Sequence, residues 1–235
     1  MIKRLLLLAF AASAWTAHAA DFSSIGALTQ DEFLRLSRDL GAAISYKGVT
    51  PATPLGVLGF DVGVEVTDTK LESSDAFARA GAGGRSHLVI PKLHLYKGLL
   101  GGLDIGAFIG GSSELSATVY GADLRYALLD DGLATPAVAL RLAGTAASGL
   151  GDLTVATVSL DVMASKKFTA LTPYAGAGVV RVQSRPGDGA LDDVRFHKGR
   201  VFGGLNVNLI GANLALEAEK MGGNTSLTAK LGLRF

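Results

Sequence analysis

The chain has 235 residues, of which 49% are hydrophobic and 18% are charged, with a formal net charge of +1 and no cysteine. The near-neutral charge gives no reason to expect a nucleic-acid partner, and the lack of cysteine excludes disulfides and thiolate metal sites. After residue 20 no stretch reaches the ~18 uninterrupted apolar residues that a membrane helix needs. These values leave two fold classes, a fully buried soluble sheet or a membrane β-barrel.

The first 19 residues have the three parts of a secretory signal peptide. Lys3 and Arg4 form the positive start, Leu5 to Trp15 the apolar centre, and Ala17-His18-Ala19 the small-residue cleavage box. The apolar centre is too short to anchor the chain in a membrane. We therefore expect residues 1–19 to be removed during export.

Residues 20–54 form an N-terminal segment in which residues 30–40 are predicted to be an α-helix. Thr29 and Glu32 have the spacing of a capping box, and Gly41 is placed to end the helix. A helix of this length spans roughly 16 Å and cannot cross a membrane. Its apolar face must be buried, either as a plug inside a barrel or, as we expect, in a cap on the periplasmic mouth or at the membrane surface. If the helix is a plug, deleting residues 20–48 should open a conductance.

From residue 55 to residue 235 apolar and polar residues alternate in ten runs, from Leu58–Thr67 to Leu227–Phe235. Each run is about long enough for the ~9–11 residues of a tilted membrane strand. With both termini in the periplasm, the two longest loops, near residues 71–85 and 184–195, fall at the opposite end, as in outer-membrane barrels. The sequence thus predicts an all-β fold, an antiparallel transmembrane β-barrel of about ten strands preceded by one short α-helix. Eight or twelve strands stay open, because residues 42–46 could add pairing.

Pro91 lies inside the second run. Proline removes one hydrogen bond from a strand ladder. We expect a bulge or an irregular edge at this position.

The last run ends Leu-x-Leu-x-Phe, at Leu231, Leu233 and Phe235. This ending resembles the terminal signature of bacterial outer-membrane proteins. With the signal peptide and the ten runs, the sequence resembles small porin-like proteobacterial outer-membrane barrels that carry a helix before the barrel. The resemblance implies location in the outer membrane, contact with its lipid, and recognition by the barrel-assembly machinery through these three residues. It implies no other functional residue.

Charged residues recur at the polar positions of the runs, which face the lumen in a barrel. Alternation predicts seven acidic and seven basic side chains there. They are Asp61, Glu65, Lys92, Asp104, Asp123, Arg125, Arg141, Asp161, Arg181, Arg200, Glu217, Glu219, Lys230 and Arg234. The equal numbers argue against a strongly ion-selective pore and for ion pairs across the interior. Glu217 and Glu219 are expected to pair with Lys230 on the adjacent strand.

Motifs for catalysis, cofactors or metals are missing from the sequence. It contains no Gly-x-Ser-x-Gly elbow and no His-Glu-x-x-His motif. His94 is expected inside the barrel as a hydrogen-bonded structural residue, and His87 and His197 near the outer rim. We expect a non-enzymatic outer-membrane protein without cofactor, structural or a narrow channel for small solutes, of undetermined oligomeric state. The alternative is an enzyme acting on lipid at the outer rim, for which His87 or His197 would be needed.

Overall fold

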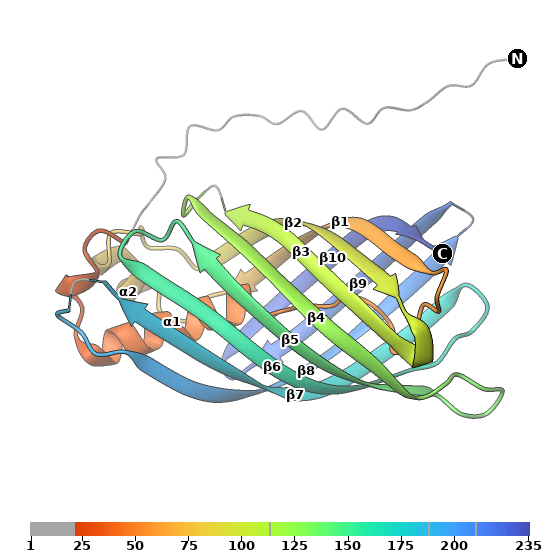
Figure 1. Cartoon of the computed structure of the whole chain (residues 1–235). Coiled ribbons are helices and arrows are strands. Elements are labelled where there is room, and N and C mark those ends of the chain that lie inside the picture. Colours follow the sequence, from red (N-terminus) through yellow and green to blue (C-terminus); the bar gives the residue numbers. More distant parts are fainter. Residues whose placement is uncertain (1–21, 113, 188, 210) are drawn as a thin grey trace, which may run out of the picture.

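The computed structural model describes residues 22–112, 114–187, 189–209 and 211–235, so the predicted signal peptide lies outside the described residues. Ten antiparallel strands close into a barrel in which each strand pairs with its neighbours in the chain and β1 pairs with β10 (Figure 1). The strands are β1 (Phe60–Lys70), β2 (His87–Gly98), β3 (Leu103–Ser112), β4 (Ala117–Leu129), β5 (Ala137–Ser148), β6 (Leu153–Ser165), β7 (Leu171–Pro186), β8 (Val194–Leu209), β9 (Ala212–Met221) and β10 (Asn224–Arg234). The predicted fold is confirmed with ten strands, and residues 42–46 add none.

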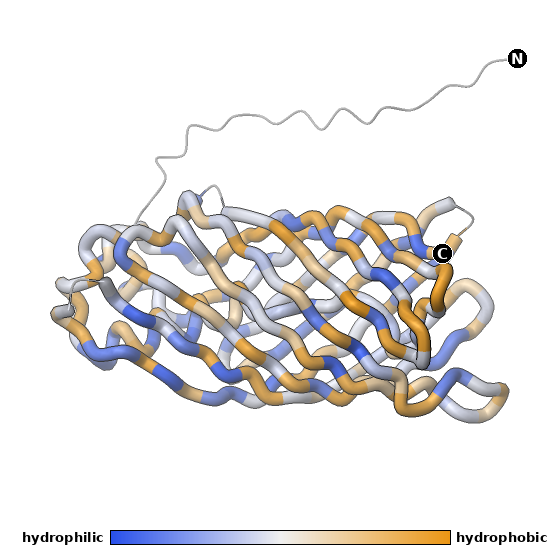
Figure 2. Tube along the Cα trace, in the orientation of Figure 1, coloured by the Kyte–Doolittle hydropathy of each residue, from blue (hydrophilic) through white to orange (hydrophobic). Residues whose placement is uncertain are grey.

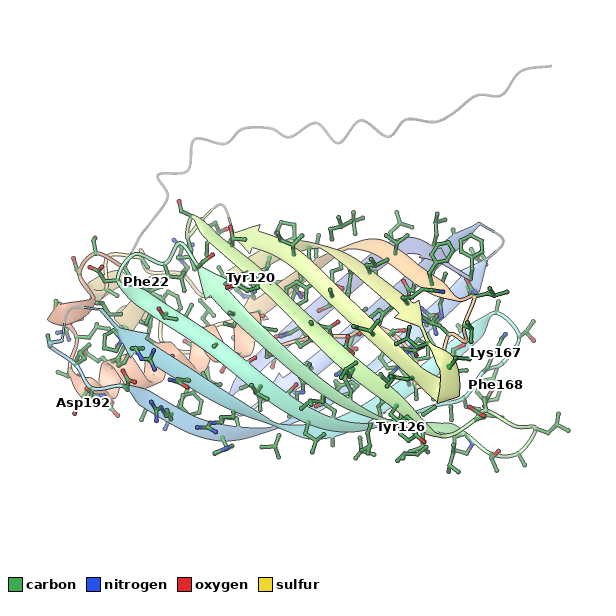
Figure 3. The ribbon with its side chains drawn as sticks, viewed as in Figure 1. Phe22, Tyr120, Tyr126, Lys167, Phe168 and Asp192 are labelled. Atoms are coloured by element: carbon green, nitrogen blue, oxygen red, sulfur yellow. The ribbon has the colours of Figure 1, made fainter. Side chains whose placement is uncertain are left out.

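The outer surface of the barrel is apolar. Outward side chains such as Val64, Leu93, Leu142 and Leu160 are each more than half exposed, and apolar and polar positions alternate along the strands in Figure 2. Tyr120 and Tyr126, both exposed, lie toward opposite ends of β4 (Figure 3). A closed barrel satisfies its backbone hydrogen bonds without an edge, and with an apolar exterior it is suited to lipid.

The two ends of the barrel differ, and we name them by their contents. The loop end carries the β1–β2 connection, which includes α2 (Ser74–Arg79), and the β7–β8 connection of residues 187–193. The terminus end carries the start of β1, the C-terminus and the 3₁₀ helix η2 (Leu100–Gly102). The β7–β8 loop is shorter than predicted because β7 and β8 extend into the range assigned to it.

The N-terminal helix α1 (Gln30–Ile44) ends later than the predicted residue 40. Its capping box is confirmed, since the Glu32 N–H donates to Thr29 Oγ1 at 3.3 Å and the Glu32 carboxylate accepts from the Thr29 N–H at 2.8 Å. Gly41 was expected to end the helix, and that prediction is wrong. A Cβ at Gly41 would lie 2.7 Å from the Cγ atoms of Val182 on β7. Glycine at this position therefore lets the helix backbone approach the barrel wall.

Helix α1 lies inside the barrel at the loop end (Figure 1), so the predicted position at the periplasmic mouth or membrane surface is wrong. Phe33, Leu36 and Leu40 are fully buried in one cluster with Val180 and Val182 of the inner wall. Eight strands leave an interior just filled by side chains, and ten leave more room. In this space the apolar face of the helix packs against the inner wall.

The N-terminal segment also starts at the loop end. Phe22, ahead of the 3₁₀ helix η1 (Ile25–Ala27), packs on Phe77 of α2 with ring centroids 6.0 Å apart. In Figure 3, Phe22 and Asp192 mark this end, whereas Lys167 and Phe168 mark the other. The expectation that both termini share one end is therefore wrong for this segment. The chain after α1 has to cross the lumen before it reaches β1.

The ladder between β2 and β3 ends at Lys92 and Gly110, next to Pro91. On the other side, β2 stays paired with β1 as far as His87 and Lys70. The bulge that was one of the two expectations is absent, because Pro91 pairs with Val66 of β1 without a register shift. The other expectation, an irregular edge, is met by the side of β2 that has no β3 partner from Pro91 onward.

Candidate functional site

The lumen is occupied by the chain itself. We call residues 22–55 the plug, and every residue from 39 to 52 is buried. The buried stretch includes the polar residues Ser45, Lys47 and Thr50, each 0% exposed. Buried polar groups are costly unless they are hydrogen-bonded or paired. The inner wall supplies those partners.

Tyr46 connects the plug to two strands of the inner wall, β2 and β4. Its hydroxyl donates to Asp123 at 2.7 Å and lies 2.8 Å from His94 Nε2 and 3.2 Å from Tyr96 Oη. His94 Nδ1 in turn contacts Glu65 at 2.9 Å. His94 is thus the hydrogen-bonded structural residue that we expected.

Asp161 is the centre of the largest ion-pair cluster. It accepts from Arg200 Nε at 2.7 Å and from Arg141 Nε at 3.0 Å, and all three side chains are at most 1% exposed. Arg200 also reaches Glu219 at 3.3 Å, and Glu219 pairs with Lys47 of the plug at 3.3 Å. The plug therefore contributes a charge to the wall network and completes it.

Toward the terminus end the plug contacts the wall through a backbone carbonyl and a side-chain hydroxyl. Arg125 pairs with Asp104 at 2.6 Å and donates to the Pro51 carbonyl at 2.5 Å. Arg234 donates to Thr50 Oγ1 at 2.5 Å. Beyond these contacts lies a recess of about 190 Å³, lined by Pro51, Thr53, Asn206 and Arg234 among others. The recess opens at the terminus end, and plug residues form part of its lining.

Lys230 was expected to pair with Glu217 or Glu219, and this is wrong. Lys230 is opposite Ala215 on β9, while Glu217 and Glu219 are opposite Thr228 and Ser226. Lys230 instead pairs with Asp61 across β1 at 2.8 Å. Asp61 also accepts from Arg234 at 3.0 Å.

The structure places thirteen of the fourteen predicted lumen charges inside the barrel, and Arg181 is the exception. Arg181 is exposed on the outer face of β7, whereas its neighbours Val180 and Val182 are fully buried. On β7 the inward and outward positions were predicted the wrong way round. The inner face of β7 is apolar where it packs against α1, so Val180 and Val182 face the lumen and Arg181 faces outward. The inward charge on β7 was therefore predicted incorrectly.

Some buried side-chain atoms in the lumen have no hydrogen-bond partner among the described residues. They include Nη1 and Nη2 of Arg141 and the hydroxyls of Ser37 and Ser184. The Arg141 guanidinium instead lies over the rings of Tyr46 and Phe202, at 5.9 and 5.0 Å. Such atoms reduce the stability of the closed lumen, because each retains its desolvation cost.

At the loop end, ion pairs attach α1 to the β1–β2 connection. Glu32 pairs with Arg79, and Arg35 pairs with Asp75 at 3.1 Å. Hydrogen bonds from Thr29 and the charge of Arg79 hold the pKa of Glu32 below its ordinary value. Burial raises the pKa of Asp39, whose carboxylate accepts from the Glu72 and Ser73 amides. The plug is therefore attached to the barrel at the loop end as well as along the lumen.

Replacing Tyr46 with phenylalanine should loosen the plug without changing its shape. Without the hydroxyl, the buried Asp123 carboxylate has one hydrogen-bond donor fewer. A buried polar group that loses its partner costs about 1–3 kcal/mol of stability. We expect a loss of this size in the free energy of unfolding, measured by urea titration in lipid vesicles. Tyr120→Phe, on the exposed outer wall, is the matched control and should change little. Equal effects of the two variants would contradict the role of Tyr46.

The histidines proposed for an enzyme do not meet. His87 contacts Asp68 at 3.0 Å on the outer face. His197 is on β8, which β1, β10 and β9 separate from the β2 strand of His87. The structure thus does not bring these two histidines together.

The residues of the expected assembly signal lie on the outer surface. Leu231 and Leu233 are 50% and 41% exposed, and Phe235 packs on Phe60 with ring centroids 4.9 Å apart. They are therefore outside the lumen and separate from the plug.

No protein-family model and no curated protein matches the sequence. Among solved structures, the chain is similar to the translocator domain of the autotransporter NalP from Neisseria meningitidis, at 12% identity and TM-score 0.43, covering 94% of this chain and all of that one. It is also similar to the KdgM porin in complex with disordered oligogalacturonate, at 6% identity and TM-score 0.40, covering 75% and 99%. For OprG from Pseudomonas aeruginosa the values are 11% and 0.36, covering 79% and 99%.

The architecture defines the class of protein. An antiparallel barrel with an even number of strands, an apolar exterior and a charged interior is the fold of bacterial outer-membrane proteins. The chain is an outer-membrane β-barrel protein whose lumen is filled by its own N-terminal segment. No helix in the described part of the chain is long and apolar enough to cross a membrane.

Proposed function

We propose that the protein is a narrow outer-membrane channel for small solutes that its plug keeps closed. The observation that carries this proposal is the polar contact between plug and wall. Lys47, Tyr46 and Pro51 bind wall residues through an ion pair and hydrogen bonds. A segment held in this way can exchange its partners for water, whereas an apolar core cannot.

A lumen without the plug would be polar and wettable. Asp104, Asp123, Arg125 and Lys92 point into it from β2, β3 and β4. Acidic and basic groups alternate around the wall, which supports weak selectivity between cations and anions rather than a strong preference. Two parts of the described wall are apolar. One lies beside α1, where Val180 and Val182 line β7, and the other lies around Ala52 of the plug, where Met163 and Phe202 meet. Small polar solutes fit such a channel best.

Single-channel recording in a planar bilayer tests the proposal. The full-length mature protein should show rare, brief openings, and the variant lacking residues 20–48 should show steady openings. The deletion removes α1, Tyr46 and Lys47 and leaves the ten strands intact. Heat-dependent migration in gels checks that both proteins contain a folded barrel. If the folded deletion variant is silent, the lumen does not conduct and the barrel is structural.

We also infer that Leu231, Leu233 and Phe235 serve as the signal for the barrel-assembly machinery. Their support is position, since all three are exposed at the end of the last strand. Replacing Phe235 with alanine should then lower the yield of assembled barrel in cells. Yields should stay equal for Phe168→Ala, an exposed aromatic residue at the same end.

A further inference from the structure

The outer face of the barrel carries a group of basic side chains at the loop end. We call Lys70, Arg181, Arg185, Arg195 and Lys220 the basic belt, and all five are exposed. They project from β1, β7, β8 and β9. Hydrophilic positions recur along β7 and β8 toward this end in Figure 2. The belt contains Arg181, the charge that had been expected in the lumen.

The belt begins where the apolar surface stops. On β7 the exposed Val179 is followed on the same face by Arg181, and on β10 the exposed Leu227 is preceded by Thr225. Outward residues alternate along a strand, so each pair is one step apart. On β1 the outward residue after Val66 is Asp68, which pairs with His87, and Lys70 follows it. The change from apolar to polar and charged residues thus marks one boundary of the lipid-facing surface.

The belt covers only one side of the barrel. Among the described residues, every outward position of β3, β4, β5 and β6 is uncharged. The charges of these strands, such as Asp104 and Arg141, all point inward. The loop-end connections on that side carry the acidic residues Glu114 and Asp152. The one-sided arrangement indicates a binding surface.

Part of the belt has no internal counter-charge. Asp193 pairs with Arg185 at 3.1 Å and with Arg195 at 3.4 Å. Lys70, Arg181 and Lys220 contact no carboxylate among the described residues. Lys220 Nζ donates to the Gly223 carbonyl and lies near Thr225, but no carboxylate neutralises it. The positive charges of these three side chains are therefore not balanced by the described residues.

Lys70, Thr225 and Lys220 form the centre of this surface. Thr225 pairs with Lys70 on β1 and with Lys220 on β9, so the three side chains lie side by side on the outer face. Adjacent strands are about 4.8 Å apart, which puts the two lysine backbones roughly 10 Å from each other across the threonine. Lys220 Nζ lies 3.4 Å from Thr225 Oγ1. Two lysines that flank a hydroxyl on one face of a sheet can together bind a phosphate group.

We propose that the basic belt binds the phosphate groups of lipid headgroups in the leaflet at the loop end. At the edge of an apolar surface, lysine stems cover hydrocarbon while the ammonium groups reach the headgroups. Arginine adds bidentate hydrogen bonds to phosphate. This inference does not depend on conduction through the lumen.

Native mass spectrometry of the full chain with phosphatidic acid and phosphatidylcholine tests the proposal. The wild type should retain phosphatidic acid in preference. The triple variant Lys70→Gln, Arg181→Gln, Lys220→Gln should lose this preference, by about fivefold per charge removed. The matched control is Lys97→Gln, Lys166→Gln, Lys167→Gln, which removes three charges at the terminus end and should keep it.

Three results would overturn the proposal. One is an equal loss in the two triple variants, and another is the absence of any preference in the wild type. The third is complete release of the lipid by millimolar inorganic phosphate, which would identify a site for free anions. Should the triple variant fail to fold, Thr225→Val removes the central hydroxyl from an exposed position and should lower the preference severalfold. An unchanged preference in that folded variant would equally count against the proposal.

Discussion

A disulfide between α1 and the barrel wall is expected to abolish the openings of the full-length channel. The pair is Gly41→Cys with Val182→Cys. A Cβ at Gly41 would lie 3.3 Å from Val182 Cβ, close to the ~3.5–4.5 Å that disulfides require. The clash of that Cβ with the two Cγ atoms of Val182 disappears, because the second substitution replaces them. The chain contains no other cysteine, so the pairing is unambiguous.

Oxidised protein should show no openings, and reduction should restore openings at least as frequent as those of the wild type. Recordings from one preparation before and after reductant measure both states. The control is Val182→Cys alone, whose current should be the same before and after reduction. A current through the oxidised double variant equal to that through the control would mean that conduction does not require movement of α1. The plug would then not be the gate.

Alternation could predict the barrel wall because lipid imposes a uniform environment outside it. Leu93, Leu142 and Leu160 had to face outward, and their neighbours Lys92, Arg141 and Asp161 then faced inward. The inside is not uniform. Where it packs against α1 it is apolar, so the period-two pattern on β7 had the wrong phase.

The contacts of the plug could not be predicted from local patterns. Arg234 and Thr50 are 184 residues apart, and Tyr46 and Asp123 are 77 apart. Neither pairing leaves a signal at short spacing. The sequence did show polar residues such as Lys47 directly after the helix. If that segment lies inside a barrel, these residues need polar partners on the wall. Even so, the position of the segment depended on the size of the lumen, which is set by ten strands closing together.

Removing the charge of Asp161 should produce the largest loss of stability of any single lumen substitution. Asp161→Asn leaves Arg141 without a carboxylate partner and Arg200 with Glu219 alone, and both arginines are at most 1% exposed. Breaking a buried ion pair by removing one partner costs about 3–5 kcal/mol. We expect a fall of this size in the free energy of unfolding, from urea titration of the protein folded in lipid vesicles. Glu114→Gln, which removes the partner of Arg85 at the surface, should cost less than about 1 kcal/mol.

A second substitution separates charge from packing at this site. Arg141 depends on Asp161 for its side-chain hydrogen bond, since its Nη atoms have none among the described residues, whereas Arg200 keeps Glu219 and the Tyr46 carbonyl. Adding Arg141→Met to Asp161→Asn should therefore restore about half of the lost stability, because it removes the cation that was left unpaired. Additive losses in the double variant would show instead that Arg141 stabilises the lumen through its ring contacts with Tyr46 and Phe202. The ion pair would then be secondary to packing, and the plug would be held mainly by the aromatic side chains around it.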